Sequence, residues 1–344
     1  MIKCTLAIST CTLAISCVVS VPPTWTPLIV GEDLQGWTIV NGDKSTWVVE
    51  DGIIICSGKP TSVMRTNKMY ENFILELDWR HMVENGNAGL FIWSDPIPAV
   101  GAPFTRSIEV QVMDGKELDW YTTHGDIFSI WGAKMTPDRP HPNGYSRCLP
   151  SERRSKPAPE WNHYTVRCID GTIKLAVNGA FVSGGYDISP RKGYICLEAE
   201  GTEAHFKNIS IMELPLSAPA TTEIAEEDKG LTTLYNGVNL EGWNTTSDSA
   251  KHWTVEGWIL LCDGSNEALL TSSEFENYEI MLDYRCSTEN GGAFVIVDGE
   301  KIELPSGKAN TWNRFVTKGK RGRVGVGGNG NPVDFCNIFI RTVK

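Results

Sequence analysis

The chain carries one sequence pattern twice, in the same order. LIVGEDLQGW at 28–37 returns as LYNGVNLEGW at 234–243, and YENFILELDWR at 70–80 returns as FENYEIMLDYR at 275–285. The separation between matching residues falls from 206 near the start to 129 at the end, where FKNISI matches FCNIFI. A constant order with a falling separation indicates one fold written twice, with internal deletions in the second copy.

The repeat divides the chain into parts with distinct roles. We expect a signal peptide at 1–21, the complete copy at 28–214, a linker at 215–230 and the shortened copy at 231–344. The linker mixes Pro, Ala, Thr and acidic residues and has no apolar period. The first copy is below called copy one, and the second copy two.

The N-terminal segment predicts export. Lys3 precedes 18 uncharged residues at 4–21, and two prolines follow. A charged start, a short apolar run and small residues at its end are typical of a secretory signal. Cleavage near Ser20 is the simpler interpretation, and lipidation at Cys17 is the alternative. We therefore expect a periplasmic or extracellular protein, with Cys17 as the candidate lipid anchor and no membrane span.

Both copies have the sequence pattern of strands. In copy one, short alternating or apolar runs bounded by Gly, Asn or Asp turns lie at 74–80, 107–113, 164–169, 172–179 and 193–200. Val177-Asn178-Gly179 predicts a hairpin turn. No segment has a helical period of useful length. The sequence therefore predicts an all-β protein of two tandem jelly-roll sandwiches, the second shortened.

Charge and cysteine content narrow the classes of partner. The 31 Lys and Arg against 42 Asp and Glu give a net charge of −11, which argues against nucleic acid or an anionic membrane surface. Seven cysteines remain beyond the N-terminal segment, without a CxxC pair, so spacing gives a zinc site almost no support. Five lie in strand-like runs and are expected to be buried free thiols: Cys56, Cys168, Cys196, Cys262 and Cys336.

Copy one alone contains a region rich in ionisable side chains. The separation between copies falls from 205 to 151 across this region, so copy two lacks 54 of its residues. The ionisable residues of the region include Glu109, Asp114, His124, Asp126, Arg139, His141 and Arg153. Because such groups supply acid–base chemistry, a catalytic site is expected in copy one.

Glu109 is the leading catalytic candidate. On a regular strand Glu109, Gln111 and Met113 share one face, and Gln111 is a candidate substrate-binding residue. A bulge at 112–113 would return Asp114 to that face and pair it with Glu109 as a second catalytic carboxylate. The alternative is a polar strand face with a solvated Glu and a turn Asp.

His124 is the third catalytic candidate. Histidine is the natural base near pH 7, and Asp126 could orient it if the backbone turns at Gly125. The two could instead bind a metal, although two ligands do not make a site. The sequence indicates no cofactor and leaves a divalent metal open. A structural or exposed loop histidine is the alternative.

Further candidates could contact a sugar directly. The proline-rich loop 134–160 carries Arg139, His141 and Arg153, which could hold sugar hydroxyls or an enolate, or merely solvate the loop. The candidate stacking platforms are Trp93, Trp120 and Trp131, because sugar C–H groups pack on aromatic faces.

Residues that recur in copy two are expected to be structural. Trp37, Trp47 and Trp161 recur and are expected in the core. Asp78 and Arg80 recur as well and indicate a structural ion pair. On a late strand, Glu198 and Glu200 alternate and could line the same sheet face as Glu109.

Eight segments together resemble one known family. They are LIVGEDLQGW, WVVEDG, FILELDWR, NAGLFIW, EVQVMD, EWNHYTV, VNGAFV and FKNISIMEL, and they cover about 28–214, with a partial second match at 231–341. In this order they resemble the 3-keto-disaccharide hydrolase domain family, which has a concanavalin-A-like jelly roll related to laminarinases. Where that family often carries Arg, this chain has Trp93, so stacking would replace a cation there.

The resemblance implies cleavage of disaccharides or glycosides that are already oxidised to a ketone at C3. The carbonyl makes the C2 proton acidic, so a base can remove it, the C1 substituent can depart, and water can add to the unsaturated sugar. Such chemistry needs a base, an acid and a group that stabilises an enolate. Two alternatives stay open: carbohydrate binding without catalysis, or a retaining glycoside hydrolase that uses Glu109 and Asp114.

Overall fold

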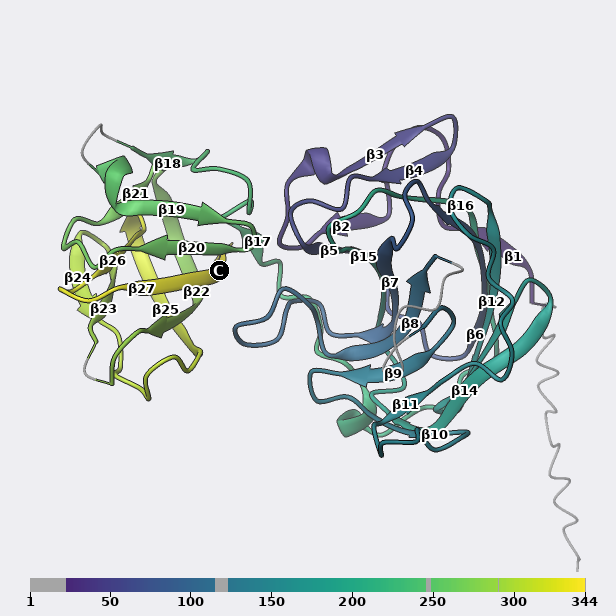
Figure 1. Ribbon diagram of the computed structural model, residues 1–344. Helices are drawn as coiled ribbons and strands as arrows, with labels where there is room; N and C mark the ends of the chain where they lie inside the picture. The colour runs from purple at the N-terminus through teal and green to yellow at the C-terminus, as the bar shows by residue number, and fades with distance from the viewer. Residues whose placement is uncertain (1–22, 115–122, 246–248, 290, 344) are drawn as a thin grey trace, which may run out of the picture.

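The computed structural model describes residues 23–114, 123–245, 249–289 and 291–343. The expected signal segment with Cys17, and the candidate platform Trp120, lie outside these residues. The chain forms two lobes, and each lobe is a sandwich of antiparallel sheets (Figure 1). No helix among the described residues is long and apolar enough to cross a membrane.

Copy one is built almost entirely of strands. Its elements are β1 (Trp25–Pro27), β2 (Trp37–Ile39), η1 (Lys44–Thr46), β3 (Trp47–Glu50), β4 (Ile53–Cys56), β5 (Ser62–Thr66), β6 (Phe73–His81), β7 (Asn87–Ser94), β8 (Ser107–Met113), β9 (Ile127–Ile130), β10 (Lys134–Pro137), β11 (Arg147–Cys148), β12 (Asn162–Ile169), β13 (Thr172–Val177), β14 (Ala180–Ser189), β15 (Tyr194–Ala199) and β16 (Ala204–Glu213).

Copy two repeats the design with fewer and shorter elements. After η2 (Thr221–Glu223) in the linker come β17 (Thr232–Thr233), β18 (Trp243–Asn244), η3 (Ser249–His252), β19 (Trp253–Glu256), β20 (Ile259–Cys262), β21 (Leu269–Thr271), β22 (Phe275–Cys286), β23 (Ala293–Val297), β24 (Glu300–Glu303), β25 (Asn313–Gly322), β26 (Gly325–Gly328) and β27 (Val333–Thr342).

Two stacked sheets enclose the core of copy one. A nine-stranded sheet has the order β10-β14-β13-β12-β6-β16-β4-β3, with β1 paired to β16, and a seven-stranded sheet has the order β11-β9-β8-β7-β15-β5-β2. Along β6 buried and half-buried residues alternate, so that Leu75, Leu77 and Trp79 enter the core. Complete burial of such a side chain contributes about 1.5–3 kcal/mol. Copy two has a six-stranded and a five-stranded sheet around its own core.

The local sequence predictions are confirmed. The five predicted strand segments correspond to β6, β8, β12, β13 and β15. The predicted hairpin turn joins β13 to β14, with Asn178 and Gly179 at φ of 47° and 88°, as a two-residue turn between twisted strands requires. All seven cysteines of the described ranges are free and buried.

Two predictions about recurring residues are wrong. Trp37 and Trp47 are buried, but Trp161 is only half-buried and packs under the side chains of Arg80 and Lys207, 4.5 and 4.0 Å from its ring centre. Asp78 and Arg80, in turn, do not pair with each other but with residues of neighbouring strands.

Asp78 and Arg80 lie two residues apart on one strand and point the same way, so each uses partners on neighbouring strands. The Asp78 carboxylate contacts His163 Nδ1 at 2.8 Å and accepts a hydrogen bond from Asn208 at 2.7 Å. Arg80 donates to His205 Nδ1. The recurrence therefore marks a structural polar cluster and not an Asp78–Arg80 ion pair.

The linker lies along copy one and is fixed to it at several points. The buried Glu71 carboxylate accepts hydrogen bonds from the backbone amides of Ser217 and Ala218, at 2.7 and 3.1 Å. Farther along, Asp228 forms an ion pair with the buried Arg65 at 2.7 Å. These contacts hold the start of copy two close to the seven-stranded sheet.

Candidate functional site

The outer face of the seven-stranded sheet carries a cluster of glutamates of copy one. On β7, β8 and β15 one set of alternate residues, which includes Leu90, Val110 and Leu197, packs into the core. The other set points away from the core, because successive strand residues face opposite ways. This outward set includes Glu109 and Glu198. The strand order β8-β7-β15 therefore places these two carboxylates on either side of β7.

Gly89 of β7 leaves the space in which the two carboxylates meet. A Cβ atom at Gly89 would lie 2.5 Å from Glu198 Oε2 and 3.1 Å from Glu109 Oε1. Both carboxylates therefore reach the same point above the strand, and any side chain at residue 89 would displace them. Glu109 is 6% exposed and Glu198 1%.

Burial and mutual repulsion favour protonation of this cluster. Burial raises the pKa of Glu109 well above its ordinary range, and the charge of Glu200 adds to the effect. Burial likewise raises the pKa of Glu198, with Glu109 and Glu200 as the charged neighbours. Since close carboxylates titrate as a unit, the cluster holds protons at a pH at which isolated glutamates are ionised.

Amide side chains connect Glu200 to the centre of the cluster. Asn87 Nδ2 donates a hydrogen bond to Glu200, and Gln111 Nε2 donates to Asn87 Oδ1 at 2.5 Å. Burial raises the pKa of Glu200, and the Asn87 hydrogen bond opposes the rise. Gln111 thus lies on the predicted face with Glu109 and helps to order the third carboxylate.

Arg147 is the cation of the site. The strand pairs place Glu109 opposite Phe128 and Phe128 opposite Arg147, so the three residues form one row across the sheet. The Arg147 guanidinium lies 3.4 Å from the centre of the Phe128 ring and forms a 2.5 Å ion pair with Asp126. Its positive charge lowers the pKa of Glu109, against the larger effect of burial.

The predicted pairing of Asp114 with Glu109 is wrong. The pairing of β7 with β8 continues without a register shift from Ile108 to Met113, so the expected bulge is missing from these described pairs. Asp114 accepts the backbone N–H of Asn85 in the turn between β6 and β7 and adds its charge to the surroundings of His81. The carboxylate that meets Glu109 is Glu198.

His124 lies in a tight turn before β9. Its Nδ1 is 3.0 Å from Thr123 Oγ1, and Gly125 adopts a φ of 77° beside it. The Asp126 carboxylate accepts the Thr123 amide at 3.0 Å and pairs with Arg147. Asp126 therefore fixes the turn and holds Arg147.

Trp93 is not a sugar platform. Its side chain is completely buried, its indole N–H donates to the Glu71 carbonyl at 2.9 Å, and its ring meets Phe73 edge-on. The reason is a bulge in β7: two residues of β15 span three of β7 between Phe91 and Ser94, and Trp93 has a φ of 54°. The bulge turns Trp93 inward.

Trp131 remains a candidate platform. It follows β9 in the turn that leads to β10 and is 50% exposed. A large exposed aromatic ring next to the strand that pairs with β8 is a suitable surface for sugar stacking.

The candidates of the proline-rich loop do not join the carboxylate cluster. Arg139 donates to the carbonyl of Leu149 at 2.5 Å and to that of Val182, which ties the loop to β14. His141 is buried against Tyr145, and the two line a separate hollow of about 580 Å³. Arg153 lies exposed on the surface.

No group of three or more His, Cys, Asp or Glu side chains within the described ranges is arranged to hold a metal ion.

Copy two has the same strand register without the carboxylates. β7 pairs with β8 as β23 pairs with β24, so that Glu109 corresponds to Lys301 and Gly89 to Phe294. In the same register, Glu198 corresponds to Gly327. The Phe294 ring fills the space above Gly327, and Lys301 lies 4.1 Å from the ring centre. Copy two therefore lacks the acid–base cluster at the matching position.

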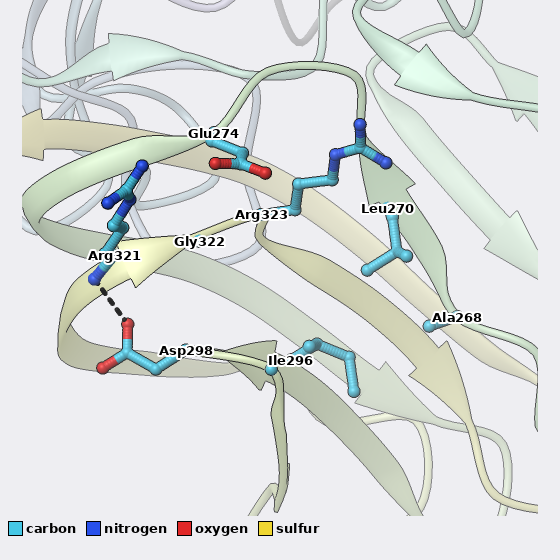
Figure 2. Close-up of a pocket in the computed structure, with 9 residues that line it drawn as sticks. Ala268, Leu270, Glu274, Ile296, Asp298, Arg321, Gly322 and Arg323 are labelled. Carbon is cyan, nitrogen blue, oxygen red and sulfur yellow. Dashed lines mark hydrogen bonds between the residues drawn. The ribbon is translucent and has the colours of Figure 1, made fainter.

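Copy two has an open hollow of about 810 Å³ on its five-stranded sheet, with residues of β21 and β23 in its lining (Figure 2). Leu270 and Ile296 form an apolar side, and Glu274 and Arg323 contribute charges. The Asp298 carboxylate is held by backbone amides of the β25 end, at 2.8 and 3.0 Å, and so has a structural role.

Sequence reasoning assigns no role to three of the residues that the fold assembles. Alternation predicts that Glu198 and Glu200 line the face of Glu109 but does not single them out as catalytic, and nothing in the sequence separates Arg147 from the other cations of the 134–160 loop. The available signal was the pair of outward glutamates on a strand that is otherwise apolar, in the segment ICLEAE. Its position beside β7 depends on strand order, which the local pattern does not contain.

One sequence family matches both copies. Residues 24–212 and 230–310 match the family described as a 3-keto-alpha-glucoside-1,2-lyase-like domain. No curated protein matches the chain.

Several solved structures are similar over about half of the chain. A candidate glycosyl hydrolase from Parabacteroides distasonis ATCC 8503 is 25% identical, with a TM-score of 0.44, over 56% of this chain and 94% of that one. The carbohydrate-binding module CBM66 from Bacillus subtilis is 16% identical, with a TM-score of 0.37, over 52% and 96%. A lichenase derived from a mouse hindgut metagenome is 15% identical, with a TM-score of 0.35, over 56% and 98%.

Proposed function

The chain belongs to the family of 3-keto-alpha-glucoside-1,2-lyase-like domains, and from this premise we propose that copy one cleaves 3-keto-glycosides by elimination followed by hydration. The observation that carries the proposal is the meeting of Glu109 and Glu198 above Gly89. Elimination requires one ionised and one protonated group on the same substrate, and close carboxylates with raised pKa values can supply both.

Glu109 is proposed as the base. Both residues have negatively charged neighbours, Glu200 and Asp126 for Glu109 and Glu109 and Glu200 for Glu198, but only Glu109 has a cation, Arg147, among the charges that act on it. When the cluster holds one proton fewer than it has carboxylates, the negative charge is therefore favoured on Glu109 and the proton on Glu198. This difference assigns separate roles to two residues of the same type.

The proposed reaction proceeds in two stages. The Glu109 carboxylate removes the proton from C2, and the electron pair forms an enolate with the C3 carbonyl. As the pair forms the C1–C2 double bond, the C1–O bond breaks, and Glu198 gives its proton to the departing oxygen. Water then adds across the double bond, with its hydroxyl at C1 and its proton returned to C2, and the net result is hydrolysis.

Other side chains of the site would support this sequence. The Arg147 guanidinium is the cation in the same row as Glu109 and is a candidate to stabilise the enolate charge. Trp131 is proposed as a stacking surface for a sugar ring, and His124 as a further proton carrier. Copy two is proposed as an accessory module, because Lys301, Phe294 and Gly327 replace the reactive positions.

The N-terminal sequence supports an exported enzyme, either cleaved near Ser20 or anchored at Cys17. A periplasmic or extracellular location would give it access to glycosides outside the cytoplasm.

The test is product analysis with a 3-keto-α-glucoside, such as 3-keto-trehalose, beside its unoxidised parent. We expect turnover of the keto-sugar alone, and deuterium from D2O at C2 of the product. Cleavage of the unoxidised sugar alone would instead favour a retaining glycosidase with Glu109 and Glu198 as its carboxylates. Binding of both sugars without turnover of either would favour a carbohydrate-binding protein.

A further inference from the structure

The loop between β7 and β8 is held by copy two. In copy one these strands are joined by residues 95–106, whereas β23 and β24 of copy two are joined by Asp298 and Gly299 alone. The longer loop reaches the six-stranded sheet of copy two (Figure 1). It connects the strand that carries Gly89 to the strand that carries Glu109.

A buried carboxylate of copy two receives the loop. Asp283 of β22 is completely buried and accepts two hydrogen bonds from Arg314, at 2.7 and 2.9 Å, and one from Asn337 at 2.8 Å. Its Oδ2 also accepts the backbone N–H of Gly101 at 3.0 Å. A buried charge needs such complete hydrogen bonding, so the loop amide completes a polar centre of copy two.

The same side chains also bind the carbonyl groups of the loop. Arg314 Nη2 donates to the Pro98 carbonyl at 2.9 Å, and Asn337 Nδ2 donates to the Ala102 carbonyl at 2.9 Å. Gly101 has a φ of 65°, and a Cβ there would overlap Trp312. Residue 101 must therefore be glycine, both because of its positive φ and because its backbone lies so close to the Trp312 indole.

The hydrogen-bonded group around Asp283 has a counterpart in copy one, but only in copy two does it also bind the 95–106 loop. Asp78 and Asn208 of copy one occupy the positions of Asp283 and Asn337 and hydrogen-bond to each other in the same way. There His163 takes the place of Arg314 and completes the cluster from within copy one. Only the centre of copy two, among the described residues, receives a segment of the other copy.

An apolar contact continues from the loop to the carboxylate site. Phe104 of the loop meets Phe91 of β7 edge-on at 5.9 Å, and Phe91 is in one buried cluster with Met281 and Phe339 of copy two. Phe91 is the direct partner of Glu109 across β7 and β8. The contact surface of copy two therefore ends one residue from the proposed base.

We propose that copy two acts as a clamp on the 95–106 loop and thereby fixes the position of Glu109, with Asp283, Arg314, Asn337 and Trp312 as positioning residues. The inference rests on the proposed function for its catalytic consequence. The loop enters β8 at Ser107, two residues before Glu109, so a displaced loop would shift the carboxylate relative to Gly89 and Glu198. A displacement of about 1 Å can cost on the order of 100-fold in rate.

The test combines a substitution that adds a side-chain atom to the loop with a second substitution, in copy two, that removes the side chain this atom would overlap. Gly101→Ala places a methyl group against the indole, and Trp312→Gly removes the whole side chain that it would meet. Gly52→Ala is the matched control, because Gly52 has a φ of 72° and open space around its Cβ position. Asn337→Gly is a second probe that keeps the positive φ of 47° and deletes the hydrogen bonds to the loop.

Two readouts separate the clamp from the reaction. Hydrogen exchange measures the amides of 107–113, and steady-state kinetics with the keto-glycoside separate kcat from KM. We expect Gly101→Ala and Asn337→Gly to speed exchange at 107–113 and to lower kcat on the order of 10- to 100-fold, with KM within about twofold. The Gly101→Ala/Trp312→Gly double variant should recover kcat relative to Gly101→Ala.

Exchange at 107–113 that stays at the wild-type rate in both variants would overturn the clamp, as would an equal loss of kcat in Gly52→Ala. Faster exchange with an unchanged kcat would overturn the positioning of Glu109. If the wild type does not turn over the keto-glycoside, the proposed function fails on its own, and exchange at 107–113 still decides whether copy two holds β8.

Discussion

Glu109 of β8 and Glu198 of β15 reach the same point above Gly89, on the strand β7 that lies between them. Among the described residues, Glu198 Oε2 is buried and has no hydrogen-bond partner. A buried carboxylate without a donor is costly when ionised, because desolvation is not compensated. The pair is therefore more stable when one of its two carboxyl groups is protonated, and acid–base catalysis by two carboxylates requires one protonated and one ionised group.

The two carboxylates should fail in different ways when each is replaced. Glu109→Gln should abolish both turnover and solvent deuterium exchange at C2, because both need the base. Glu198→Gln should lower kcat on the order of 10²- to 10⁴-fold while exchange at C2 continues. An aryl 3-keto-glucoside, whose leaving group needs no proton, should restore turnover to Glu198→Gln. Restoration of Glu109→Gln by that substrate would reverse the assignment.

Glu198→Gln should also make the protein more stable at neutral pH. Burial raises the folded-state pKa of Glu198 above its ordinary value of 4.5, so its contribution to stability is complete below about pH 4.5 and is lost as pH rises through the folded pKa. Glutamine removes that loss. Each 1 kcal/mol gained should raise the Tm by about 2–4 °C at pH 8 and have little effect at pH 4. A lower Tm at pH 8 would contradict an uncompensated carboxylate.

Arg147→Met should shift the acid limb of the pH–rate profile to higher pH. The guanidinium lowers the pKa of Glu109, so its removal should raise that pKa further, and the base should ionise only at higher pH. Arg147→Lys keeps the charge and is the matched control, with a smaller shift. The measurement is kcat/KM from pH 4 to 9. An unchanged acid limb in Arg147→Met would show that Glu109 is not the base.

Gly89→Ala tests the space above β7. The added methyl group would lie 2.5 Å from Glu198 Oε2 and 2.9 Å from a ring carbon of Phe91. Overpacking of this kind costs about 1–3 kcal/mol, and the displaced carboxylates should lower kcat on the order of 100-fold. Thermal unfolding and kinetics of the same preparation separate the two effects. Full activity would mean that the carboxylates need not meet there.

Trp131→Ala should weaken substrate binding without slowing the reaction. The half-exposed indole has no role in the core, so stability should change by less than about 0.5 kcal/mol. Loss of a stacking surface should raise KM on the order of 10-fold with kcat unchanged. Trp131→Phe is the control and should retain most of the affinity. A KM of Trp131→Ala equal to that of the wild type would show that Trp131 does not stack on the substrate.

The sequence predicted those parts of the site that depend on local alternation. Glu109 and Gln111 share a face because β8 is regular, and period two is visible in the residues themselves. The repeat also identified which copy holds the acid–base cluster.

The remaining parts depend on pairing between distant strands. Asp114 would have joined Glu109 only if β8 had a bulge, and the bulge lies in β7 instead, where it turns Trp93 into the core. Glu198 meets Glu109 because β15 lies beside β7, more than 80 residues away along the chain. Neither register nor strand order is encoded in a short window of sequence.

The 95–106 loop also limits how this architecture can grow. Copy one offers a long loop and copy two offers the centre that receives it, but copy two has only a two-residue turn where its own loop would be. The contact is head-to-tail and cannot be repeated, because a third copy of the short form would find no loop to receive. A third short copy could therefore not be attached through this loop contact.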